Sequence, residues 1–145
     1  MLPALAGWFA FVTLGLIAGV HVYWGFGGLW PATSEPELVR TVVGISHAPT
    51  MPPSSSTFLV AALIFAAAAF GLARGVLGLD SLLFVRIPVG VIAIVMLARG
   101  VYAYLPGPFA RATEPFATLN ATIFSPLILI LALTYAWLAL APGDA

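Results

Sequence analysis

The sequence predicts an all-α integral membrane protein, an up-and-down bundle of four helices with one long extramembrane loop between the first two. Hydrophobic residues make up 62% of the 145 residues and charged residues only 7%, against about half and about a quarter in soluble domains. Four apolar runs reach the roughly 20 residues that a membrane-spanning helix needs. The absence of cysteine excludes a disulfide framework, and zero formal net charge leaves no basic surface for nucleic acid.

We expect a single transmembrane domain over residues 1–145, and the expected spans are residues 3–26, 57–77, 81–105 and 115–140. The first run carries no charge, and no Lys or Arg precedes it, which is unlike a signal peptide. The second run meets a charge only at Arg74, in its last turn, where a cation suits the helix dipole and can reach the interface. The third carries Arg86 and Arg99 near its two ends, and the fourth carries no charge.

The long connection, residues 27–56, is rich in Pro, Ser and Thr. Loops of this length in a small domain are often functional. Four spans put both termini on the side of the short turn near residues 78–80, and the long loop on the other side. Because a long loop with few cations is easily translocated, we expect cytoplasmic termini, although the arginines are almost evenly divided between the two sides.

Small residues and prolines indicate how the spans would pack. Helices in lipid associate through close contacts of small residues. The small residues expected at the contacts are Gly15 and Gly19 in the first span, Ala62, Ala66, Ala69 and Ala73 in the second, and Gly90 and Ala93 in the third. These faces fit either contacts within one bundle or a homodimer seam. Pro88 and Pro126 each remove a helical hydrogen bond, so a kink is expected at each.

A layer of polar and aromatic side chains lies at the level of the long loop, where two spans end and two begin. Its members are His21, Tyr23, Trp24, Arg99, Tyr102, Asn120 and Ser125. Polar groups at membrane depth are costly and are candidates for function. If the faces with His21 and Arg99 point inward, they line a small pocket in which Arg99 would hold a carboxylate or phosphate. In the alternative, Arg99 bonds Asn120 only to join two helices, and the aromatic residues form an interfacial belt.

The polar residues do not form a recognisable catalytic or metal site. His21 and His47 could bind a metal or haem together, but no Cys and no pair of acidic ligands accompanies them, so we expect no metal and no cofactor. No acidic residue lies at membrane depth to act as a general base. We therefore name no catalytic residue, and a non-enzyme is the favoured interpretation.

Three segments resemble a known family. They are HVYWGFGGLWP at residues 21–31, LARGVY at 97–102 and FATLNATIFSPLILI at 116–130. Together they resemble a family of small bacterial four-helix membrane proteins, catalogued as domain of unknown function three-nine-nine-five. The resemblance implies that His21, Tyr23, Trp24, Gly27, Gly28, Arg99, Ser125 and Pro126 occupy the family's characteristic positions. Asn120 stands where the family is expected to have Asp, and the Cys expected after the Ser-Pro pair is absent. Asn120 leaves Arg99 an acceptor but no counter-charge.

The favoured function is that of an accessory or structural subunit of the bacterial inner membrane, a multi-pass protein whose polar layer binds an anionic lipid or amphiphile. Its expected partners are membrane lipids and other membrane subunits or a second copy of the chain. The alternative is a small membrane enzyme or carrier for a lipid-like substrate at the long-loop face. In that case His21 would act as acid or base and Arg99 as the anion clamp.

Overall fold

The computed structural model describes residues 1–44, 50–79, 82–105 and 112–141, and these residues form helices and loops without a strand. The long helices are α1 (Leu2–Gly25), α3 (Ser54–Gly75), α4 (Leu83–Tyr102) and a continuous helix, Phe116–Leu140. The last consists of α5 (Phe116–Leu119), the π-helical turn η4 (Asn120–Phe124) and α6 (Ser125–Leu140). All four are long and apolar enough to cross a membrane, with mean hydropathies from 1.9 to 2.2. The predicted fold class is confirmed.

The helix ends differ from the expected ones by a few residues. Helix α3 begins at Ser54 rather than Thr57, because the carbonyl of Pro53 accepts the backbone N–H groups of Ser56 and Thr57 and so starts the first turn. Helix α4 ends at Tyr102. Residues 80 and 81, near the expected start of the third span, lie outside the described residues, as does His47.

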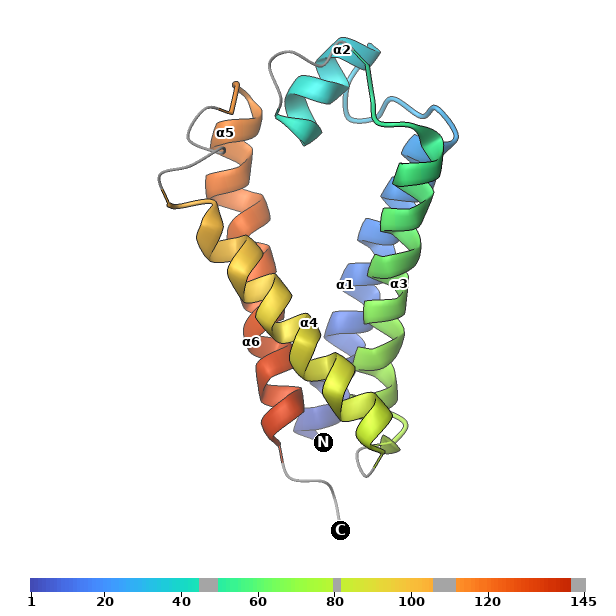
Figure 1. The fold of residues 1–145 in the computed structure, drawn as a ribbon, viewed down its shortest axis with the longest axis vertical. Coiled ribbons are helices and arrows are strands. Elements are labelled where there is room, and N and C mark those ends of the chain that lie inside the picture. The colour runs from blue at the N-terminus through green and yellow to red at the C-terminus, as the bar shows by residue number, and fades with distance from the viewer. Residues whose placement is uncertain (45–49, 80–81, 106–111, 142–145) are drawn as a thin grey trace.

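The four long helices form two pairs arranged as a V (Figure 1). Helix α1 packs along α3, and α4 packs along α6. The pairs meet where α1 starts, α6 ends and α3 connects to α4, which we call the closed end; they diverge toward the open end. The long loop lies over the open end and contains α2 (Glu35–Leu38) and the π-helical segment η1 (Val39–Val43).

Residues 35–44, which we call the cap segment, link the loop to the start of the fourth helix. Leu38 and Val39 are fully buried. Gly44 has φ +75°, a backbone conformation that favours glycine, and a Cβ there would collide with the ring of Phe116. The backbone N–H of Thr113 donates to the Gly44 carbonyl over 3.4 Å. The long loop is therefore anchored to the second helix pair as well as to the first.

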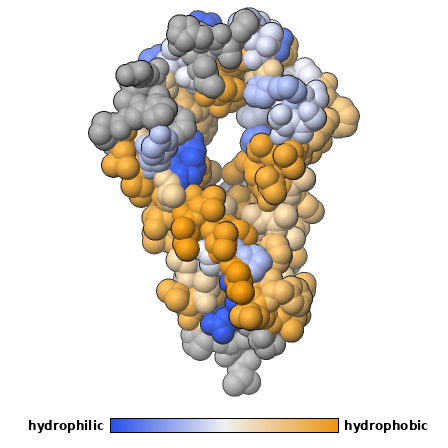
Figure 2. Space-filling view, viewed as in Figure 1, coloured by the Kyte–Doolittle hydropathy of each residue, from blue (hydrophilic) through white to orange (hydrophobic). Residues whose placement is uncertain are grey.

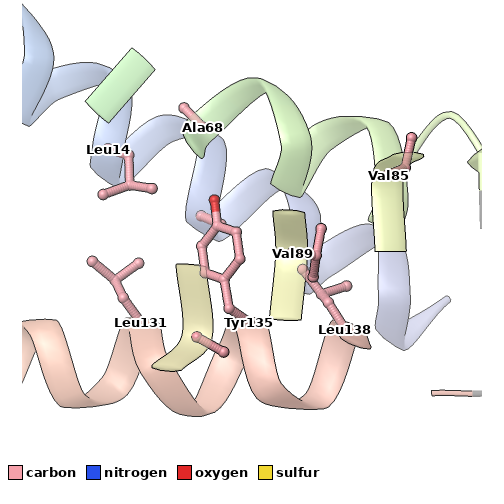
Figure 3. Packing of buried hydrophobic residues seen from close by; sticks show 9 residues of the cluster. Leu14, Ala68, Val85, Val89, Leu131, Tyr135 and Leu138 are labelled. Atoms are coloured by element: carbon pink, nitrogen blue, oxygen red, sulfur yellow. The ribbon is translucent and has the colours of Figure 1, made fainter. Parts of the chain in front are cut away.

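A hydrophobic core fills the closed end (Figure 3). Leu14 of α1 faces Leu131 of α6, and the ring of Tyr135 lies between the two pairs. Its hydroxyl donates to the carbonyl of Ala67 on α3 over 2.6 Å. Beyond Leu14 and Leu131 the pairs separate.

Arg74, in the last turn of α3, is buried inside the bundle. It is only 4% exposed, and its Nη2 donates to the carbonyl of Ala141, just after α6, over 2.7 Å. Its Nε is buried and has no hydrogen-bond partner among the described residues. The end of α6 offers carbonyls without partners in the helix, and these attract the cation inward.

The glycines that bring α1 against α3 are Gly7, Gly71 and Gly75, not Gly15 and Gly19. A Cβ on Gly7 would lie 3.0 Å from the Gly71 carbonyl and from the Cα of Gly75.

Most of the other small residues expected at helix contacts do not lie at contacts in the structure either. A Cβ on Gly15, Gly19 or Gly90 would meet nothing within 4 Å, and Ala62, Ala66 and Ala69 are exposed, whereas Ala93 is buried as expected. Both α1 and α3 are apolar on all sides, so the sequence does not mark which face packs.

Candidate functional site

The polar layer expected at the level of the long loop lies at the open end, but its residues belong to two opposite walls. His21, Tyr23 and Trp24 are on α1, in the first helix pair. Arg99, Tyr102, Asn120 and Ser125 are on α4, η4 and α6, in the second pair. The two groups therefore belong to different helix pairs, which diverge toward the open end.

Arg99, Asn120 and Ser125 form a hydrogen-bonded cluster on the second pair. Nη2 of Arg99 donates to Oδ1 of Asn120 over 2.9 Å, and the Ser125 hydroxyl donates to the same oxygen over 3.2 Å. Asn120 and Ser125 are buried, whereas Arg99 is partly exposed. The next residue, Gly100, lets α4 approach α6, since a Cβ there would lie 2.6 Å from Cδ2 of Leu129. This close approach brings Arg99 within reach of Asn120.

The π-helical turn η4 is what places Asn120 beside Ser125. In a regular α-helix, positions five apart lie on different faces. In η4 the backbone N–H of Ser125 bonds to the carbonyl of Asn120, five residues earlier, so one extra residue fits into the turn. Pro126 follows in the first turn of α6. The sequence analysis placed both residues in one layer but missed this turn, for which Ser-Pro inside an apolar run is the available signal.

The electrostatics of the cluster follow from the amide of Asn120. Asn120 supplies an oxygen acceptor but no negative charge, so it does not neutralise the guanidinium of Arg99. Tyr102, one turn further on, is exposed at the end of α4. A positively charged side chain thus lies in the last turn of α4, on the second pair.

His21 lies on the wall of the first pair. It follows Leu14 by two helical turns and so lies on the side of α1 that faces α6. Its Nδ1 is 2.8 Å from the carbonyl of Ile17. A carbonyl only accepts, so Nδ1 carries the proton and Nε2 of the neutral ring is an acceptor. The ring packs against that of Trp24, with centroids 5.1 Å apart.

Tyr23 and Trp24 hold the chain that follows α1. The indole N–H of Trp24 donates to the carbonyl of Trp30 over 2.7 Å, and the N–H of Trp30 donates to the Tyr23 hydroxyl over 3.4 Å. A side chain on Gly28 would collide with the Tyr23 ring. These contacts give the HVYWGFGGLWP segment a structural role, and Tyr23 and Trp30 remain exposed as in an interfacial belt.

An opening passes through the molecule between the two pairs, below the cap segment (Figure 2). Hydrophobic residues surround much of it, and a strongly hydrophilic patch borders it on the side of α4 and α6. The turn of α4 that carries Arg99 lies on that side. One helical turn from Leu14 and Leu131 toward the opening lie Ile17 and Leu127, both only partly buried. Hydrophobic and strongly hydrophilic surfaces thus meet at the opening.

A second depression lies on the outer face of α1 and is shallow. It is lined by Gly15, Leu16, Gly19, Val20, Tyr23 and Trp30. Apart from Tyr23, none of the predicted polar-layer residues borders it. As for metals, the part of the chain that the structure describes holds no group of three or more His, Cys, Asp or Glu that could bind an ion.

Comparisons with known proteins give a family without an assigned activity. A family model described as "Protein of unknown function (DUF3995)" matches residues 14–135 of this chain. The matched stretch contains both walls of the opening, including His21, Arg99 and Asn120, and the resemblance drawn from the three sequence segments is confirmed. No curated protein and no solved structure matches the chain.

Proposed function

The chain belongs to the DUF3995 family, and we propose that it binds an anionic lipid in the opening between its two helix pairs, with Arg99 holding the headgroup. We place it in the bacterial inner membrane with cytoplasmic termini. The observation that supports the proposal is the hydrogen bond from Arg99 to the neutral amide of Asn120, on the helix pair that borders the opening on its hydrophilic side.

Charge and polarity support an anionic amphiphile as the ligand. A guanidinium forms paired hydrogen bonds with carboxylates and phosphates, which are the anionic groups of lipids. The apolar residues beyond Arg99, such as Ile17 and Leu127, would contact the acyl chains.

An accessory or structural role within a larger membrane assembly accompanies this proposal. In each of the four helices only 22–28% of the most apolar stretch is buried inside the chain, so wide apolar faces remain for lipids, other subunits or a second copy. Such faces are where membrane helices associate.

A second candidate function is that of a small membrane enzyme or carrier for a lipid-like substrate. Nε2 of His21, an acceptor on the wall opposite Arg99, favours it, because a neutral imidazole can take up a proton. Conversion of the bound lipid by the wild-type protein and not by His21→Ala would support this candidate.

Native mass spectrometry of protein extracted gently from its own membrane tests the proposed function. We expect the wild type to retain an anionic lipid that Arg99→Gln loses. Arg40→Gln is the matched control, since Arg40 is an exposed arginine of the cap segment. A wild-type chain without anionic lipid, or equal lipid in wild type and Arg99→Gln, would overturn the proposal.

A further inference from the structure

We infer that the cap segment is a releasable clasp between the two helix pairs. It is fixed to the first pair, docks on the second pair through Gly44 and Phe116, and so sets how far the pairs diverge at the open end. The clasp acts whatever ligand the protein binds. Three features carry this inference: how the pairs are joined at the closed end, how the long loop is fixed to the first pair, and how it is fixed to the second.

The closed end is the fixed point of the V. A hydrophobic core packs the two pairs together here (Figure 3). Hydrogen bonds from Tyr135 to the carbonyl of Ala67 and from Arg74 to the carbonyl of Ala141 also join the pairs at this end. Beyond the core the pairs diverge (Figure 1). Elements that are packed at one end can change their angle there through small shifts of the packed helices.

The long loop is fixed to the first pair on both sides of the cap segment. After α1, the indole N–H of Trp24 donates to the carbonyl of Trp30 over 2.7 Å. Before α3, the backbone N–H of Met51 donates to the carboxylate of Glu35, in α2, over 2.8 Å. A hydrogen bond to a carboxylate is among the stronger ones in proteins. The cap segment therefore moves with the first pair.

The cap segment meets the second pair mainly by packing. Segment η1 packs against α5, and Gly44 lies against the ring of Phe116, which is buried. The N–H of Thr113 donates to the carbonyl of Gly44, but at 3.4 Å this hydrogen bond is long and therefore weak. This joint is the one that releases. Its release lets the pairs move apart about the closed end and widens the opening between them (Figure 2).

Two glycines of the long loop provide a matched test of the joint. Gly44 and Gly27 have φ +75° and +87°, so alanine strains the backbone at either position. A Cβ on Gly44 would collide with the ring of Phe116, whereas a Cβ on Gly27 would meet nothing within 4 Å. Gly44→Ala should therefore open the joint, and Gly27→Ala should strain the loop but leave the joint closed. Phe116→Ala weakens the same joint without straining the backbone.

The test measures distances between spin labels in the full chain in detergent, by double electron–electron resonance. The sequence contains no cysteine, so labels attach only at introduced cysteines. Leu59→Cys with Ile123→Cys labels the open end, and Leu5→Cys with Leu140→Cys labels the closed end. These four side chains are more than half exposed.

We expect one narrow distribution of open-end distances in the wild type and in Gly27→Ala. In Gly44→Ala and Phe116→Ala it should broaden and extend to longer distances, while the closed-end distances stay unchanged. Open-end distances that are already broad in the wild type, or equal in the wild type and both joint variants, would overturn the clasp. Equal broadening in Gly27→Ala and Gly44→Ala would also overturn it, because strain in the loop would then be the cause. If Gly44→Ala does not fold, Phe116→Ala decides.

Discussion

The hydroxyl of Tyr135 donates a 2.6 Å hydrogen bond to the carbonyl of Ala67, on the helix pair opposite its own. Farther along the same two helices, the guanidinium of Arg74 on α3 donates a hydrogen bond to the carbonyl of Ala141, just after α6. Both bonds join the two pairs at the closed end, where the core lies. The closed end is thus held by two hydrogen bonds that the sequence analysis did not predict. At the open end, the cap segment links the two pairs.

Replacing Tyr135 by Phe tests the first of these bonds. The ring stays in the core, but the hydroxyl is lost, and we expect a loss of about 0.6–1.7 kcal/mol in the free energy of unfolding, the range for hydrogen bonds between membrane helices. Unfolding in a denaturing detergent measures this change. Thr134→Val is the control, because the hydroxyl of Thr134 donates within its own helix, to the carbonyl of Ile130. Equal effects of the two variants would contradict a bond between the pairs.

The contact between α1 and α3 predicts that replacing two glycines by alanine will change the stability of the protein in opposite directions. In Gly75→Ala the new methyl would collide with Pro3 and lie 2.8 Å from the Cα of Gly7, so the helices must separate, at a cost of about 1–3 kcal/mol. In Gly15→Ala the methyl meets nothing within 4 Å, and the helix gains about 0.5–1 kcal/mol. Thermal unfolding of both variants checks the prediction, and a destabilised Gly15→Ala would indicate a partner helix on that face.

Asn120→Asp should weaken lipid binding at the site without disrupting the fold. The new carboxylate would lie where Asn120 now accepts from Arg99 over 2.9 Å, and the ion pair would compete with an anionic lipid for the guanidinium. We expect lipid affinity to fall about tenfold, which corresponds to roughly 1.4 kcal/mol, while the fold is retained. Ser125→Ala, which leaves the Arg99–Asn120 bond in place, is the control. Unchanged affinity in Asn120→Asp would argue that Arg99 does not contact the lipid.

The local stability of the chain around Thr33 and Glu37, at the start of the cap segment, should depend on pH. The backbone N–H and the hydroxyl of Thr33 donate to the Glu37 carboxylate over 2.9 and 2.8 Å, and these bonds lower the pKa of Glu37 below its ordinary value of 4.5. A carboxyl with a lowered pKa stabilises the folded state above its unfolded pKa, and this contribution is lost as the pH falls through the lowered value. Protection of the Thr33 amide from hydrogen exchange, corrected for the intrinsic rate, should therefore decrease in acid. Glu37→Gln should show no such dependence; if it follows the wild type, another group is responsible.

The spans could be predicted because bilayer thickness sets both the length and the composition of a membrane helix. The rotation of each helix about its own axis could not be predicted. Because α1 is apolar on every side, nothing in its sequence distinguishes the face with Gly7 from the face with Gly15. Arg99, Asn120 and Ser125 could be assigned to one layer from topology. Their hydrogen bonding depends on the extra residue in η4, and the separation of His21 from Arg99 depends on the angle between the helix pairs, which arises from packing at the distant closed end.

Photo-crosslinking with phosphatidylglycerol that carries a diazirine on its acyl chain tests most directly whether lipid lies between the helix pairs. We predict that the wild type is labelled at Ile17 and Leu127, one helical turn from Leu14 and Leu131 toward the open end, as well as at outward residues such as Leu16 and Ile94. Arg99→Gln should lose the first labels and keep the second. Labelling of Ile17 and Leu127 that is absent in the wild type, or unchanged in Arg99→Gln, would contradict a lipid site governed by Arg99.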